Sequence, residues 1–96
     1  MKIEKKQDGG KMTFKLEGWL DTQAAPELKA ALEELPGDVT ELTLDCATLE
    51  YISSSGLRQF VAAHKQMKGA FTLANVSAEI MDVLNMTGFS KKLHIV

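Results

Sequence analysis

Cysteine and histidine are scarce in this chain of 96 residues, which has one cysteine, Cys46, and two histidines. A single thiol cannot form an internal disulfide, and no Cys and His residues have the spacing of a zinc site. We therefore expect no structural metal and no metal ligand. A lone cysteine also favours a reducing, cytoplasmic setting.

Long apolar runs and an excess of basic residues are missing as well. No uncharged apolar stretch approaches the roughly 20 residues that cross a bilayer, and the N-terminus lacks the apolar segment of a signal peptide. Eleven Lys and Arg against 13 Asp and Glu give a net charge of -2. This balance disfavours binding to a phosphate backbone, so we expect a soluble protein with no nucleic-acid partner and no membrane insertion.

The residues that are present favour one domain. Hydrophobic side chains make up 45% of the chain, and its length suits a single core. No linker, repeat or low-complexity segment interrupts it. The sequence therefore predicts a single domain over residues 1–96.

The N-terminal part has the pattern of a hairpin. From Lys11 to Leu16, apolar and polar residues alternate as in a half-buried strand. The preceding Asp8-Gly9-Gly10 suits a tight turn, so a first strand around Lys2 to Lys6 is expected to pair with it. This pairing is antiparallel.

Helical spacing begins after Gly18. Apolar residues recur up to Pro36-Gly37, where the first helix is expected to stop. Its inward residues are Leu28, Ala31, Leu32 and Leu35. Pro26 is tolerated in the opening turn, and Asp21 or Thr22 is a suitable cap.

Strands and helices alternate through the rest of the chain. The predicted strands are Val39 to Leu44, with Leu42 and Leu44 inward, Ala70 to Ala74, and Leu93 to Val96. The predicted second helix begins within Ser53 to Gly56 and ends at Gly69, with Leu57, Phe60, Val61 and Met67 inward. Ser77 caps a third helix that carries Ile80, Val83 and Leu84 and is closed by Gly88. The order β-β-α-β-α-β-α-β predicts an α/β fold with a mixed, mostly parallel sheet and an N-terminal antiparallel hairpin.

Three consecutive serines, Ser53, Ser54 and Ser55, lie where the second helix is expected to begin. Unpaired N–H groups and the positive end of a helix dipole stabilise a negative charge there by about 0.3 to 1 kcal/mol. The position therefore suits a phosphate. Serine is also a preferred helix cap, and Ser-Ser-Ser-Gly is ordinary loop chemistry, so the residues alone favour capping over a phosphate site.

Enzymatic interpretations have less support. A Ser/His/acid triad would need His64 or His94, but His64 is two turns beyond Leu57 and His94 is on the outward face of the last strand. No nucleophile elbow, P-loop or dinucleotide-binding turn is present. The acid pairs Asp21 with Glu17 and Asp45 with Glu50 are better explained by solvation or capping. We expect no catalytic residue, no cofactor and no enzyme activity.

Three segments resemble one known family. These segments are Leu16-Glu17-Gly18-Trp19-Leu20-Asp21, the stretch from Leu42 to Leu57 that contains Ile52-Ser53-Ser54-Ser55-Gly56-Leu57, and Leu73 to Ser77 followed by Leu84 to Phe89. In this order and spacing they resemble the STAS domain, and within it the stand-alone bacterial anti-sigma factor antagonists. The resemblance spans nearly the whole chain and implies a mixed sheet with helices packed against it.

The resemblance also implies a mechanism. In phosphorylatable antagonists, the serine two residues before the glycine accepts phosphate from a kinase anti-sigma factor, and here that residue is Ser54. The unphosphorylated form binds the anti-sigma factor and frees sigma, and a metal-dependent serine phosphatase reverses the modification. Ser53, Ser55 and Gly56 are the implied neighbours of the phosphosite and its helix cap. The implied partner-binding residues are Trp19, Asp21, Thr22, Ser53, Ser54, Leu57 and Arg58.

Two positions depart from the family pattern. Ser53 stands where the family usually has Asp, and Trp19 stands where a small or acidic residue is common. An exposed Trp19 would be a candidate contact residue, and a buried one would belong to the core. The missing Asp motivates an alternative, a binding subunit of another assembly such as a lipid-transport ATPase, that acts without phosphorylation. Nucleotide binding at the strand ends is a third, weaker hypothesis.

Overall fold

Five strands form one mixed sheet in the computed structural model, which describes residues 1–96. They are β1 (Lys2–Asp8), β2 (Lys11–Leu20), β3 (Glu41–Ile52), β4 (Phe71–Ala74) and β5 (His94–Ile95). Their order in the sheet is their order in the chain. The β1–β2 pair is antiparallel and every other pair is parallel, which confirms the predicted sheet with its N-terminal hairpin.

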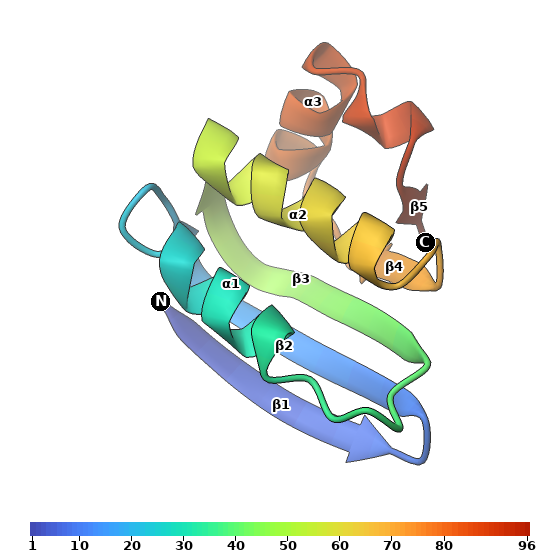
Figure 1. Cartoon of the computed structure of the whole chain (residues 1–96). Coiled ribbons are helices and arrows are strands. Elements are labelled where there is room, and N and C mark those ends of the chain that lie inside the picture. Colours follow the sequence, from blue (N-terminus) through green and yellow to red (C-terminus); the bar gives the residue numbers. More distant parts are fainter.

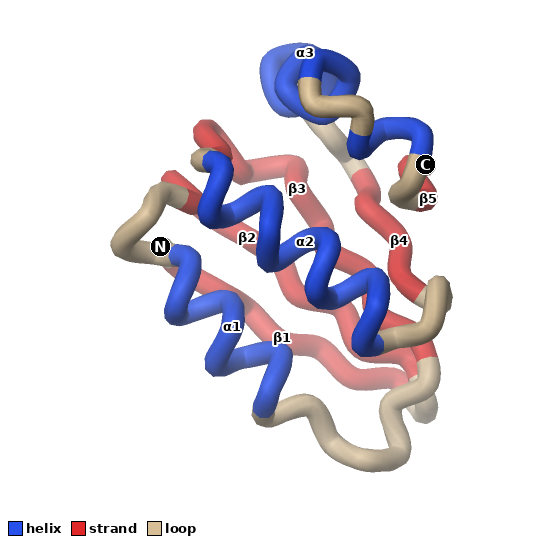
Figure 2. Tube along the Cα trace, turned by 45° about the horizontal axis from the view of Figure 1, so that its top comes forward, coloured by secondary structure: helices blue, strands red, loops and turns tan.

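The helices connect the parallel strands. They are α1 (Ala25–Glu33), α2 (Ser54–Gln66) and α3 (Ala78–Met86), followed by a 3-10 turn, η1 (Phe89–Lys91), that was not predicted. In Figures 1 and 2, α1 and α2 lie side by side across one face of the sheet, and α3 lies beyond α2, away from β1. No helix is long and apolar enough to cross a membrane.

The predicted limits of β3 are wrong at both ends. The strand was expected over Val39 to Leu44, whereas it begins at Glu41 and continues to Ile52. It continues because β2 also runs past Leu16, to Leu20, and the two strands stay paired in parallel through two register shifts. A strand can be longer than its alternating pattern when a neighbour supplies hydrogen bonds across such irregularities.

The start of α1 also differs from the prediction. The N-cap residue is Ala24 and has no side-chain cap, so neither Asp21 nor Thr22 caps the helix itself. A turn separates them from it, and the Asp21 carboxylate accepts from the Ala24 N–H at 2.8 Å within that turn. Pro26 lies in the opening turn, as predicted. Leu35 lies beyond the end of the helix and packs against the core from there.

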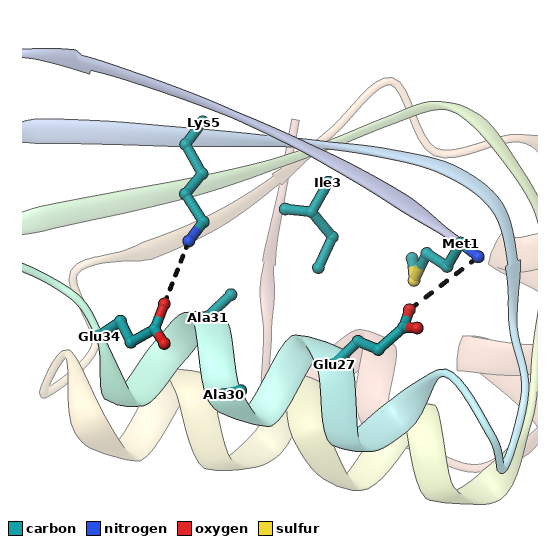
Figure 3. Close-up of a pocket in the computed structure, with 7 residues that line it drawn as sticks. All are labelled: Met1, Ile3, Lys5, Glu27, Ala30, Ala31 and Glu34. Atoms are coloured by element: carbon teal, nitrogen blue, oxygen red, sulfur yellow. Dashed lines mark hydrogen bonds and ion pairs between the residues drawn. The ribbon is translucent and has the colours of Figure 1, made fainter.

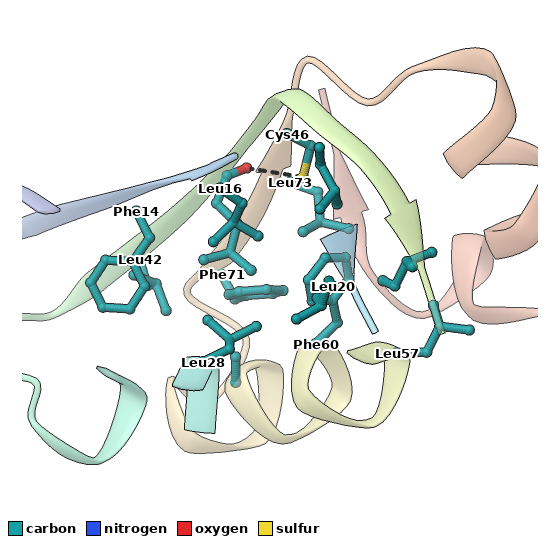
Figure 4. Close-up of a cluster of buried hydrophobic side chains, with 14 of the residues drawn as sticks. Phe14, Leu16, Leu20, Leu28, Leu42, Cys46, Leu57, Phe60, Phe71 and Leu73 are labelled. Atoms are coloured by element: carbon teal, nitrogen blue, oxygen red, sulfur yellow. Dashed lines mark hydrogen bonds between the residues drawn. The ribbon is translucent and has the colours of Figure 1, made fainter. Parts of the chain in front are cut away.

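One hydrophobic cluster lies between the sheet and the helices (Figure 4). It includes the predicted inward residues of β2 and the fully buried Phe14, Phe60 and Phe71. In α2, Val61 was expected to face inward but is only partly buried, whereas Ala63 is fully buried. Leu57 and Phe60 of α2 belong to this cluster together with residues of β2 and β3, so the first half of the helix packs on the two long parallel strands.

Cys46 offers a direct check of this core. Its thiol is fully buried and donates to the Leu44 carbonyl oxygen at 3.7 Å. Burial, with a smaller contribution from the negative charge of Asp45, raises the pKa of the thiol to about 12. The thiolate is the reactive form, and it is scarce at any pH well below 12.

We expect iodoacetamide at pH 8 to label native protein at least about 100-fold more slowly than protein unfolded in guanidinium. Rapid labelling of the native chain, measured by mass spectrometry, would contradict the packing around Cys46.

Candidate functional site

The candidate site lies at one end of the sheet. The carboxyl ends of β2 and β3 meet the starts of α1 and α2 there, at the upper left of Figure 1. Ser53 follows β3 directly, and its N–H donates to the Leu20 carbonyl oxygen at the end of β2, at 2.9 Å. This backbone hydrogen bond ties the first turn of α2 to the neighbouring strand.

The three serines have different environments. Ser53 is the N-cap of α2, and its Oγ accepts from the Gly56 N–H at 3.2 Å. Ser54 is the first helical residue and is exposed, whereas Ser55 is partly buried. The hydroxyls of Ser54 and Ser55 make no hydrogen bond within the chain. The capping interpretation is therefore confirmed for Ser53. Ser54 presents an exposed hydroxyl that makes no hydrogen bond within the chain.

Gly56 allows α2 to start this close to the sheet. A Cβ at this position would lie 2.7 Å from Leu20 Cγ, 2.9 Å from the Leu20 carbonyl oxygen and 3.0 Å from Ile52 Cγ1. The backbone of Gly56 does not have a positive φ, so the requirement for glycine is steric. The close approach holds Ser54 beside the carboxyl ends of β2 and β3.

Two aromatic side chains are exposed on the other face of the sheet, at the same end. Trp19 and Tyr51 are paired in the β2–β3 register, with exposures of 57% and 44% and ring centroids 5.2 Å apart. Their neighbours Leu20 and Ile52 are buried under the helices, so the two rings point away from them. Tyr51 was missed because β3 was expected to end at Leu44, before the alternation reached it.

Some of the other predicted partner-binding residues are exposed, and some are partly or fully buried and hold the local backbone in place. Thr22 and Arg58 are exposed, whereas Asp21 is partly buried and holds the turn before α1. Leu57 corrects the prediction, because it is only 3% exposed and packs in the core. Its side chain is not available to a partner. It supports the start of α2 from beneath.

The second acid pair does not form a carboxylate site. Asp45 accepts from the Asn75 side-chain amide and from the Ala47 N–H, each at 3.0 Å. The Asn75 hydrogen bond, with help from Ala47 and the charge of Lys15, holds the pKa of Asp45 below its ordinary value despite partial burial. Such bonds favour the ionised form, so Asp45 acts as an acceptor that links the middle of β3 to Asn75, the residue that follows β4.

The histidines are not part of the site. The ring of His64 meets Phe71 edge-on, with centroids 6.4 Å apart, and its Nδ1 is buried without a hydrogen-bond partner. His94 is exposed on β5. No group of three or more His, Cys, Asp or Glu side chains could hold a metal ion.

The chain matches one protein family over nearly its whole length. The family model for the STAS domain matches residues 2–96, so the chain belongs to the STAS domain family. This confirms the resemblance drawn from the sequence motifs.

The chain is similar to anti-sigma factor antagonists. It is 26% identical over 96 residues to the anti-sigma-B factor antagonist of Bacillus subtilis (strain 168), covering 97% of this chain and 88% of that protein. An anti-sigma factor antagonist from Mycobacterium paratuberculosis has the same fold, with a TM-score of 0.87 and 20% identity over 98% of this chain and 83% of that one. A sulfate transporter family protein from Wolinella succinogenes also shares it, with a TM-score of 0.77 and 20% identity over 90% of this chain and 75% of that one.

Proposed function

We propose that the chain is an anti-sigma factor antagonist, and that phosphorylation of Ser54 switches off its binding to the anti-sigma factor. The observation that carries this proposal is the state of Ser54. It is exposed and unbonded at the first position of α2, two residues before Gly56, where the family motif has its acceptor. The low-identity relative named as an antagonist supports the same role.

The proposed chemistry needs no catalytic group from this chain. The anti-sigma factor is a kinase that holds ATP, and the Ser54 Oγ attacks the γ-phosphorus. The bond from that phosphorus to the bridging oxygen breaks, ADP leaves, and a base on the kinase accepts the hydroxyl proton. A metal-dependent serine phosphatase later transfers the phosphoryl group to water. In this scheme the chain is a cytoplasmic substrate and ligand.

A phosphate on Ser54 is expected to change binding without disturbing the fold. A phosphate on Ser54 would lie at the positive end of α2, where negative charge is stabilised. The cap is supplied separately by Ser53 and would persist. The modification adds roughly -1.5 to -2 charges to a chain whose net charge is -2. The contact surface therefore changes sharply while the scaffold remains.

The proposed contact surface surrounds this end of the sheet. It comprises the exposed residues Trp19, Thr22, Ser54 and Arg58, together with Tyr51. Asp21 and Ser53 belong to it as residues that hold its backbone in place. The exposed aromatic pair provides the kind of anchor that dominates many interfaces.

Phosphorylation tests the site directly. The chain is incubated with ATP and the anti-sigma kinase of its own organism, and intact mass is measured. We expect one phosphate on the unchanged chain and none on Ser54→Ala, because Ser54 has the exposed hydroxyl. Ser55→Ala is the matched control and should be phosphorylated to the same extent. Phosphate retained in Ser54→Ala would refute the assignment.

One observation favours a second function. Ser53 replaces the family's usual Asp beside the acceptor, which is compatible with a STAS subunit that uses the same surface without being phosphorylated. A lipid-transport ATPase complex is one such assembly. Ser54→Asp distinguishes the two functions by affinity for the captured partner. A phosphoswitch predicts a clear loss of affinity, whereas unchanged affinity for a transporter ATPase would favour the second function.

A further inference from the structure

A hollow lies between the starts of α1 and α2. Its volume is about 330 Å³, and its lining includes Thr22 and Lys29 on the α1 side and Ser55, Arg58 and Gln59 on α2. No acidic side chain lines it. The polar groups it offers are two cations, two hydroxyls and one amide.

Neither cation has an ion-pair partner. The ion pairs of the chain join Met1 to Glu27, Lys2 to Glu4, Lys5 to Glu34 and Lys11 to Glu41. Lys29 and Arg58 are in none of them, and neither makes a side-chain hydrogen bond. Their charges are available to a group from outside the chain.

The charges of α1 are divided between its two sides. Figure 3 shows the side toward β1, where Glu27 meets the N-terminal ammonium at 3.9 Å and Glu34 meets Lys5 at 3.5 Å. Lys29 instead lines the hollow toward α2. Of the three charged side chains of this helix, Glu27 is thus already paired, on the side away from Lys29, and Glu33 does not line the hollow; Glu34, just beyond the helix, is paired as well.

The other wall of the hollow is formed by α2, which lies in a segment without acidic residues. No Asp or Glu occurs between Glu50 and Glu79, whereas Arg58, Lys65 and Lys68 lie in this interval. Helix α2 therefore presents only positive formal charge, in a chain that is acidic as a whole. Such a local field attracts a group of opposite sign and disfavours a cationic one.

We propose that this hollow binds an acidic side chain of the protein partner, with Lys29 and Arg58 contacting its carboxylate. The proposal rests on the proposed function, because it names the chemistry by which the anti-sigma factor is recognised. Arg58 lies one turn after Ser54, a spacing at which side chains are neighbours. A phosphate on Ser54 would add negative charge beside these cations and weaken their attraction for a carboxylate.

A titration with defined probes tests the hollow. The isotope-labelled chain is titrated at low salt with a capped hexapeptide of alternating aspartate and glutamate, and separately with inorganic phosphate, while amide chemical shifts are followed. We expect saturable shifts at residues around the hollow with the peptide. The double variant Lys29→Gln/Arg58→Gln should weaken peptide binding by about tenfold.

The matched control removes the same charge elsewhere. Lys65→Gln/Lys68→Gln takes two cations from the same segment but outside the hollow, and should change the affinity less than about twofold. Equal losses in both double variants, or no saturable shifts, would overturn the proposal. Phosphate binding as tight as peptide binding would overturn it too, because the hollow would then be a general anion site.

A second measurement separates this proposal from the proposed function. Affinity for the anti-sigma kinase is compared between the unchanged chain and Lys29→Gln/Arg58→Gln. A loss of about tenfold supports both. Unchanged affinity overturns the carboxylate site and leaves the antagonist function intact. No complex even with the unchanged chain overturns the antagonist function, while the peptide titration still decides about the hollow.

Discussion

Gly56→Ala is expected to destabilise the domain by about 2 kcal/mol, within the usual cost of overpacking a filled site. The new methyl group would lie 2.7 Å from Leu20 Cγ and 2.9 Å from the Leu20 carbonyl oxygen, closer than packed atoms allow. One of these atoms belongs to the backbone of β2, so α2 and the strand must separate. This loss should lower Tm by about 10 °C in a domain of this size, measured by calorimetry.

Gly37→Ala is the matched control for this prediction. No atom lies within 4 Å of a Cβ built on Gly37, and its backbone is not in the left-handed region. We expect a stability change within about 0.5 kcal/mol. Equal melting temperatures for Gly56→Ala and Gly37→Ala would show that α2 does not depend on close contact with β2.

Trp19→Ala should reduce affinity for the anti-sigma factor by about thirtyfold, the effect of losing an interface anchor worth about 2 kcal/mol. Trp19 is 57% exposed, and its ring lies 5.2 Å from the exposed ring of Tyr51, tilted by 36° to it. Its removal should therefore affect stability much less than it affects binding. Because it is the single tryptophan, its fluorescence in the unchanged chain also reports complex formation.

Met86→Ala provides a control for exposed hydrophobic area. Met86 is 86% exposed and lies at the end of α3, outside the proposed contact surface. We expect affinity within about twofold of the unchanged chain, by calorimetric titration. If Trp19→Ala also stayed within twofold, the aromatic pair would not be part of the interface.

Elements with strong local signals were predicted well. The alternation before Leu16 and the glycines of the first turn produced the hairpin, and the cap residues Ser53 and Ser77 accept from Gly56 and Ile80. The length of β3 was predicted wrongly because it depends on a neighbouring strand. β3 runs to Ile52 because β2 pairs with it that far, and the residue pattern of β3 does not contain this information.

The candidate site was predicted in part for the same reason. Ser54 was identified from a motif within one segment, and the structure adds that it is exposed and unbonded. Tyr51 and Lys29 were not identified. Tyr51 is paired with Trp19 from another strand, and Lys29 and Arg58 line one hollow from two different helices. Contacts between distant segments depend on register and helix packing, which local patterns do not encode.

The sequence by itself excludes an internal disulfide, because the chain has one cysteine. It also shows that the Cys and His residues lack the spacing of a zinc site. The order of strands and helices also follows from the sequence, because periodicity, glycine and capping residues act over short distances. Only the tertiary structure decided which residues of the serine cluster and of Trp19-Leu20 face solvent, and which cations remain unpaired. Those properties depend on the close approach of α2 to β2 and on the packing of α1 beside α2, which arise only when segments far apart in sequence meet.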